Sequence, residues 1–289
     1  MKTFRMIGMA LLAILLSVNL VSCDKDEDGT TGGGSGAATG SGVSLGNGKK
    51  LVRVLEFSDG GGELMSKTEL KYDAQGRVVE ADNKWKDYTG GPWIPDNIKY
   101  SWESNKVTGS WKGYNPEYEY MFVGGKVSKK IEYWKDSEDG DWNIGTYNFI
   151  YDKDGHIKEH WRDDEGEKCD VNTYTWNNGQ LSLIEEDDEG EYSSEHFRYG
   201  NQTCKGFNPM LFLYVEAVYH DEYIFIAHPE LIGIETTHLP AKSVKGDYTT
   251  TFEYELDSDG YVIGCTTRGT YANWGGSGSN VDYYEFAWE

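Results

Sequence analysis

Basic residues are scarce in this chain of 289 residues. Lys and Arg together number 27 against 49 Asp and Glu, which gives a formal net charge of −22 at pH 7. The phosphates of nucleic acids repel such a chain, and nothing in the sequence gathers Lys and Arg into a compensating patch. Nucleic acid is therefore excluded as a partner.

Metal-binding patterns are also lacking. The six histidines show no H-E-x-x-H pattern of a zinc-hydrolase helix, and His156 and His160, which are four positions apart, lie around one predicted hairpin as cross-strand polar residues. Two acidic stretches, Glu185–Gly190 and Glu255–Gly260, partly imitate a calcium loop, but His196 and Thr266 stand where its bidentate Glu belongs. Hairpin turns explain both stretches better. No cofactor is predicted, and only weak calcium binding at the surface stays open.

An uncharged apolar stretch, Met6–Val21, lies near the start of the chain. Lys2 and Arg5 precede it, and it leads through Leu-Val-Ser to Cys23. This order is that of a secretory signal, although the stretch is nearly long enough for a transmembrane anchor. Its ending resembles the lipobox of bacterial lipoproteins, in which the cysteine is acylated and becomes the new N-terminus. Residues 1–22 are therefore predicted to be a lipoprotein signal peptide, and Cys23 the lipid attachment site.

Residues 23–49 are predicted to form a lipidated tether, first acidic and then rich in Gly. Asp24–Asp28 holds four acids in five positions and resembles the signal that exports lipoproteins of Bacteroidetes-type cells to the cell surface. An Asp directly after the cysteine also resembles the inner-membrane retention signal of enteric bacteria, but the acidic cluster fits export better. In Gly29–Gly48, nine of twenty residues are Gly. A flexible coil of this composition spans about 25 Å.

The mature chain is expected to be held at the outer membrane by lipid and not by charge. Removal of residues 1–22 takes away two bases and no acids, so the net charge becomes 25 − 49 = −24. Each buried methylene of an acyl chain contributes about 0.8 kcal/mol, so two or more chains anchor stably. We therefore predict a lipid-anchored protein that is exposed at the cell surface.

Three cysteines remain beside Cys23: Cys169, Cys204 and Cys265. Export to an oxidising compartment permits one disulfide and leaves one thiol over. Three buried free cysteines that act as small apolar residues are equally compatible with the sequence. No rule of sequence selects between these alternatives.

Residues 50–289 are predicted to be a single antiparallel β domain. Gly is frequent, at 36 residues, and aromatic residues reach 14%, which suits strands and turns. A turn with Asp or Asn and Gly recurs between strands of alternating polarity, and its clearest copies are Lys71–Val78, Tyr151–Ile157 and Tyr254–Val262. This alternation predicts an all-β, up-and-down meander of hairpins, strongly twisted or partly closed as a barrel.

The turn sequences resemble a known repeat. Tyr72-Asp73-x-x-Gly76-Arg77-Val78 and Tyr151-Asp152-x-x-Gly155-x-Ile157 are similar to the YD repeat of bacterial wall-associated and Rhs-type shells. The whole chain more closely resembles uncharacterised Bacteroidetes surface lipoproteins with degenerate YD-like hairpins, some of which have a porin-like fold. The resemblance implies a fold for most of residues 50–289 and supplies no catalytic residue.

One insertion, at about residues 205–246, interrupts the hairpins. Asn208-Pro209 is typical of the start of a helix. Met210–Tyr219 continues without Gly or Pro, which predicts a short helix whose buried face carries Phe212, Val215 and Tyr219. We expect the insertion to cover the apolar face of the sheet as a lid or flank.

Tryptophan carries the one prediction of a ligand-binding site. Sugar-binding surfaces use exposed aromatic faces flanked by carboxylates and amides. Most aromatic residues here fit the alternation of strands, and cross-strand packing explains them. Three lie nearer to turns and are the predicted ligand-binding residues: Trp85, Trp93 and Trp142.

The predicted function is a non-catalytic binding or accessory module at the cell surface. Its expected partners are the membrane, through the lipid anchor, and a glycan or an envelope protein. Two alternatives stay open: a glycoside-processing enzyme with a carboxylate pair assembled across strands, and a purely structural envelope protein. Among 49 acids some pair always lies at the separation that glycoside hydrolysis needs, so the sequence identifies no catalytic residue.

Overall fold

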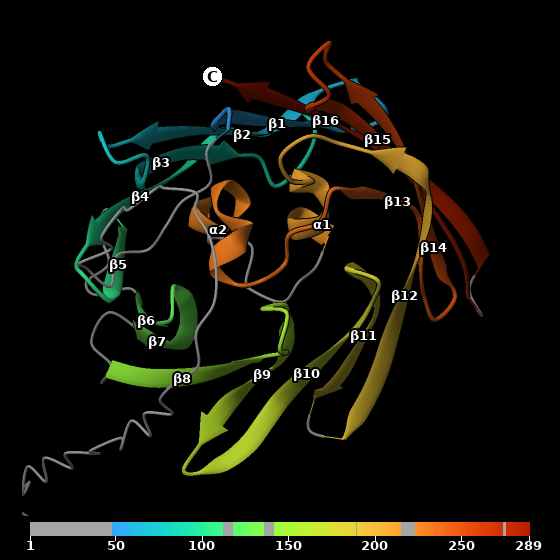
Figure 1. Cartoon of the computed structure of the whole chain (residues 1–289). Coiled ribbons are helices and arrows are strands. Elements are labelled where there is room, and N and C mark those ends of the chain that lie inside the picture. Colours follow the sequence, from blue (N-terminus) through green and yellow to red (C-terminus); the bar gives the residue numbers. More distant parts are fainter. Residues whose placement is uncertain (1–47, 112–117, 136–141, 189, 215–222, 274–275) are drawn as a thin grey trace, which may run out of the picture. The chain divides into compact units, whose positions relative to one another are not determined.

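A closed β-barrel accounts for nearly all of the described structure. The computed structural model describes residues 48–111, 118–135, 142–188, 190–214, 223–273 and 276–289. Within them, sixteen antiparallel strands pair in sequence order, and β1 pairs with β16 to close the ring (Figure 1). The predicted all-β meander is confirmed, and its closure is complete.

The strands vary from six to thirteen residues in length. Their bounds are β1 Leu51–Phe57, β2 Leu64–Tyr72, β3 Val78–Trp85, β4 Ile94–Trp102, β5 Lys106–Trp111, β6 Tyr118–Val123, β7 Lys126–Lys135, β8 Trp142–Tyr151, β9 Ile157–Asp164, β10 Glu167–Asn177, β11 Gln180–Asp188, β12 Glu191–Thr203, β13 His238–Lys245, β14 Tyr248–Leu256, β15 Val262–Asn273 and β16 Gly276–Trp288.

The two ends of the barrel have different connections. At the end that we call the turn end, even-numbered strands pass into odd-numbered ones, mostly through tight turns such as 73–77, 152–156 and 257–261. In these three turns, Oδ1 of the first Asp accepts backbone N–H bonds from residues two and four positions later, at 2.9–3.0 Å. The opposite end, which we call the rim end, carries connections such as 58–63 and 86–93.

Aromatic side chains at the turn end tie neighbouring hairpins together. Trp102 and Trp176 donate from Nε1 to the carbonyl oxygens of Val78 and Ile157, both at 2.7 Å. The same bond joins Tyr72 to Leu51, Tyr151 to Val127 and Trp288 to Val262. The five acceptor residues are at most 1% exposed. A repeated aromatic-to-carbonyl bond therefore accompanies the recurring turn around the barrel.

The described residues of the segment between β12 and β13, 204–214 and 223–237, lie inside the barrel (Figure 1). It contains α1 (Pro209–Tyr214), α2 (Tyr223–Ala227) and the 3-10 helix η1 (Pro229–Leu231). Phe225 is fully buried and packs edge-on against Tyr120, with ring centroids 5.0 Å apart. Ile157 N donates to Gly233 O at 3.1 Å. We call these described residues the plug, because many of their side chains are buried in the core of the barrel.

The plug differs from the predicted insertion in extent and position. It ends at residue 237 and not near 246, because His238–Lys245 pair as strand β13. The predicted helix start is confirmed, since Asn208 Oδ1 accepts the N–H of Met210 at 3.1 Å. The Phe212 side chain, Val215 and Tyr219 lie outside the described part of the structure. Closure of the sheet turns its apolar face inward, so the covering segment lies within the ring.

No described helix is long and apolar enough to cross a bilayer. The outer wall of the barrel carries charged cross-strand pairs. Lys71 and Glu80 approach to 2.6 Å, Lys106 and Glu119 to 3.0 Å, and Arg268 and Glu253 to 3.6 Å. Their strand neighbours Leu70, Ala81, Tyr120 and Phe252 are buried in the interior. Polarity therefore alternates between an apolar core and an outer face that carries charged pairs.

Candidate functional site

Inward positions change from apolar to polar as the strands approach the rim end. Thr68 and Asn83 are buried there, and Thr68 Oγ1 donates to Asn83 Oδ1 at 3.0 Å. Trp85 follows Asn83 by two positions and so shares its inward face, yet its side chain is 38% exposed. Because Trp85 is the last residue of β3, its indole is accessible at the mouth of the barrel at the rim end.

Polar residues surround Trp85 on the inner face. Trp85 pairs with Ser66 on β2, and Ser66 pairs with Glu56 on β1. Asn83 Nδ2 donates to Asp96 Oδ2 on β4 at 3.4 Å. We call this set the Trp85 cluster: Glu56, Ser66, Asn83, Trp85 and Asp96. It combines an exposed aromatic face with hydroxyl, amide and carboxylate groups from four adjacent strands.

Trp93 stands beside this cluster in the connection 86–93. Glu63 accepts hydrogen bonds from Lys86 Nζ at 2.5 Å and from the backbone N–H of Gly90 at 2.8 Å. The Lys86 and Gly90 hydrogen bonds hold the pKa of Glu63 below its usual range. Lys86 Nζ lies 4.6 Å from the Trp93 ring centroid, and Trp93 is 42% exposed. The connection is therefore held in place beneath an accessible indole.

A second aromatic surface, absent from the sequence predictions, lies on β14–β16. Tyr248 and Tyr271 stack at 6.4 Å, and Tyr271 is 42% exposed. A Cβ at Gly278 would lie 2.2 Å from the Tyr271 ring, so only glycine lets this ring lie against the wall. Tyr248 OH donates to Asn280 Oδ1 at 2.7 Å. We call Tyr248, Tyr271, Gly278, Asn280 and Asp282 the Tyr271 platform.

The β7–β13 wall carries a partly buried polar cluster that sequence reasoning also missed. Tyr174 OH lies 3.0 Å from His160 Nδ1. Burial, and after it the positive charge of Lys130, lower the pKa of His160 to about 4. Glu186 accepts from Ser193 Oγ at 2.6 Å and pairs with Lys245 at 2.9 Å. The strand register reveals this cluster, because Phe149 of β8 pairs with His160 of β9 and so places His160 on the inward face among core residues.

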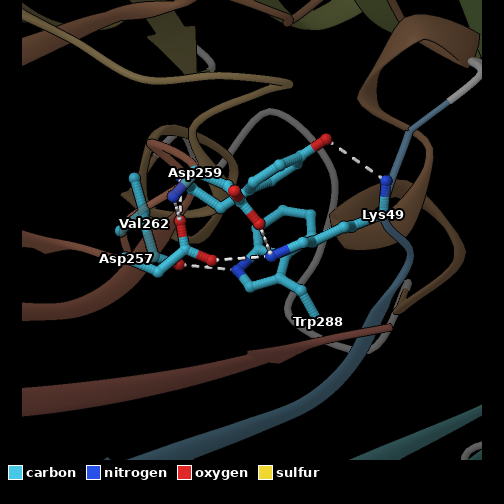
Figure 2. Close-up of polar contacts among 6 residues, drawn as sticks. Lys49, Asp257, Asp259, Val262 and Trp288 are labelled. Carbon is cyan, nitrogen blue, oxygen red and sulfur yellow. Dashed lines mark hydrogen bonds and ion pairs between the residues drawn. The ribbon is translucent and has the colours of Figure 1, made fainter.

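The first described residues are fixed at the turn end, far from the rim connections. Figure 2 shows Lys49 Nζ bound to Asp257 at 2.9 Å and to Asp259 at 2.7 Å. Hydrogen bonds to these carboxylates raise the pKa of Lys49. Glu289 N donates to Lys50 O at 2.9 Å beside them. The chain therefore enters and leaves the barrel at the same end.

All three predicted ligand-binding residues stand at the rim end of their strands or connections, and the side chains of two of them are described. The expected exposure of Trp85 and Trp93 is observed, whereas their binding of a ligand stays a prediction. Trp142 begins β8 opposite Lys135, and its side chain lies outside the described part, as does Cys23. Cys169, Cys204 and Cys265 are all free thiols.

Comparison with solved structures supports the barrel as a known architecture. The chain is similar to a porin-like protein from Bacteroides uniformis ATCC 8492, with a TM-score of 0.66 and 16% identity over 83% of this chain and 98% of that one. A porin-like protein from Bacteroides vulgatus ATCC 8482 gives a TM-score of 0.53 and 14% identity, over 84% and 99% respectively. The sequence matches no protein-family model and no curated protein. The likeness shows a porin-like fold.

Proposed function

We propose that this chain is a lipid-anchored, non-catalytic binding module of the outer-membrane surface, and that its rim end binds a glycan. Acylated Cys23 holds the mature chain to the membrane through the Gly-rich tether. The barrel displays the Trp85 cluster, Trp93 and the Tyr271 platform at the end opposite to the attachment of the tether.

The charged residues on the outer wall of the barrel support the proposal that lipid, and not the barrel itself, attaches the protein to the membrane. Transmembrane barrels present an apolar band to the bilayer and keep polar residues inside. This barrel has charged pairs such as Lys71–Glu80 outside and buried apolar residues of the plug inside. A wall charge in mid-bilayer costs about 2–4 kcal/mol, so a wall of this kind belongs in water. The buried plug residues Ile224 and Phe225 also argue against a conducting pore.

The observation that carries the ligand class is the exposed, inward-facing indole of Trp85. A pyranose presents an apolar face of C–H groups and a rim of hydroxyls. An aromatic ring packs on the apolar face, while carboxylate, amide and hydroxyl groups pair with the rim. Glu56 and Ser66 provide a carboxylate and a hydroxyl group on the inner face around Trp85. Trp93 and Tyr271 extend the aromatic surface along the rim end.

A glycan array followed by calorimetry tests this proposal with the full mature chain. We expect retention of at least one oligosaccharide, and a loss of affinity of about tenfold in Trp85→Ala, because one aromatic contact is worth about 1.4 kcal/mol. Tyr192→Ala is the matched control, since Tyr192 is an aromatic residue of β12 that is 81% exposed. Retention of no glycan, or equal affinity in Trp85→Ala and the wild type, would contradict the proposal.

A further inference from the structure

Two tyrosines of the Tyr271 platform lie flat against the barrel wall, each over a glycine of the neighbouring strand. A Cβ at Gly278 of β16 would overlap Tyr271 Cζ and lie 2.5 Å from its Cε1. A Cβ at Gly269 of β15 would overlap the Tyr248 hydroxyl oxygen and lie 2.8 Å from its Cζ. Because a strand Cβ projects out of the sheet, each ring occupies the space that a side chain at its glycine would fill.

The strand pattern places both rings on the inner face of the wall. Tyr248 precedes the buried Thr250 of β14 by two positions, and Tyr271 follows the buried Thr267 of β15 by four. Residues that are an even number of positions apart share a face of a strand. Tyr271 is 42% exposed although one face of its ring lies against β16. The opposite face of the ring is therefore open to a ligand.

The two rings form one flat surface. Tyr248 and Tyr271 pair directly across β14 and β15. Their planes differ by 9°, and their centroids are 6.4 Å apart. Since one ring lies over β15 and the other over β16, they stand side by side on the wall and not face to face. The platform is therefore two aromatic rings wide.

Hydrogen-bonding groups border this surface on β16. Asn280 Oδ1 accepts the Tyr248 hydroxyl at 2.7 Å, and Asn280 Nδ2 donates to Asp282 Oδ2 at 2.9 Å. The first bond holds the Tyr248 ring across Gly269. Asn280 is itself exposed, so an amide lies at the edge of the aromatic surface, where the hydroxyls of a stacked sugar would meet it.

We propose that the Tyr271 platform binds two consecutive residues of an extended, β-linked chain of glucose-configured sugars. This inference rests on the proposed glycan binding and names the class of glycan. In such sugars all ring substituents are equatorial, so both faces of each ring present C–H groups to an aromatic surface. The β-linkage of cellulose-type chains keeps successive rings in one flat ribbon, whereas the α-linkage of starch-type chains curves the chain away from a flat wall.

Calorimetry of the full mature chain in detergent with cellotetraose and maltotetraose tests the inference. Both probes are neutral tetramers of glucose that differ only in their linkage. We expect cellotetraose to bind about tenfold more tightly, because its second sugar ring gains an aromatic contact worth about this factor. Equal affinity for the two tetramers, or tighter binding of maltotetraose, would overturn the inference.

Gly278→Ala tests the flat arrangement without removing either ring. The added methyl group displaces the Tyr271 ring from β16, so we expect this variant to bind cellotetraose about tenfold more weakly and to lose its preference over maltotetraose. Gly200→Ala is the matched control, because Gly200 is an exposed glycine of β12 whose Cβ would meet only Ala241 Cβ, at 4.0 Å. Its affinity for cellotetraose should equal that of the wild type.

Near-ultraviolet circular dichroism verifies that each variant is folded, and Tyr271→Ala takes the place of Gly278→Ala if that variant does not fold. Wild-type affinity for cellotetraose in the folded variant would overturn the inference. If neither tetramer bound, while another glycan bound and lost affinity in Trp85→Ala, the inference would fall alone. If no glycan bound at all, the proposed function would fall with it.

Discussion

His160 makes the stability of the barrel depend on pH in a calculable way. The side chain is buried between Phe149 and Tyr174, with ring centroids 5.5 and 5.9 Å away. Its pKa falls from an ordinary value of about 6.5 to about 4 on folding. Between these values the unfolded chain is protonated at this site while the folded chain is not. The contribution of His160 to stability is therefore full above the unfolded pKa and is lost progressively as the pH falls from the unfolded pKa of about 6.5 through the folded pKa of about 4.

The size of the effect follows from linkage. Between pH 8 and pH 5 the difference in proton binding at His160 removes about 2 kcal/mol from the free energy of unfolding. Glu186 and Asp170 oppose the shift by attracting the proton, whereas Lys130 adds to it. We expect His160→Gln to be less stable than the wild type at pH 8 and to lose about 2 kcal/mol less on acidification to pH 5.

Urea unfolding followed by tryptophan fluorescence at pH 8, 6.5 and 5 measures this difference. The difference between the free energies of unfolding of the wild type and His160→Gln is taken at each pH. This difference cancels the contribution of carboxylates that titrate elsewhere, apart from those that interact with His160. Parallel loss of stability in wild type and His160→Gln would refute the account of a buried neutral imidazole.

Two further predictions concern the packing of the barrel. Phe225→Ala should lower the free energy of unfolding by about 3–5 kcal/mol, because Phe225 is fully buried against Tyr120. Thermal unfolding measures the loss, with Val123→Ala at an exposed position as the control. An unchanged Tm in Phe225→Ala would show that the plug does not support the barrel. Trp176→Phe should cost about 1 kcal/mol through loss of the bond to Ile157 O. Trp161→Phe on the outer wall is the control for Trp176→Phe. An equal loss of the free energy of unfolding in the two variants would contradict a stabilising role of the aromatic-to-carbonyl bond.

The strands were predictable because their pattern is local. Alternation such as Tyr147, Phe149 and Tyr151 against Asn148 and Ile150 has the period of a strand, and Asp with Gly dictates the turns. Closure was not determined by these signals, since the pairing of β1 with β16 joins residues more than 200 positions apart. The plug was recognised by its helix start, but its place inside the ring follows only from closure.

The candidate site was predictable in part for a similar reason. Trp85 and Trp93 lie at the ends of strands, where side chains often remain accessible, and this was visible in the sequence. The Tyr271 platform depends on Gly278 lying opposite Tyr271 across β15 and β16, which only the register reveals. The His160 cluster likewise needs the pairing of β8, β9 and β10. Chemistry that is assembled across strands depends on long-range pairing and not on local pattern.

Flotation with vesicles tests most directly the claim that lipid, and not the barrel wall, holds this protein to a membrane. Uncharged phosphatidylcholine vesicles avoid repulsion of the acidic chain. The full mature chain, acylated at Cys23, should rise with the vesicles in a density gradient, and residues 49–289 without lipid should stay in the aqueous fraction. Flotation of residues 49–289 to the same extent as the acylated chain would contradict the account.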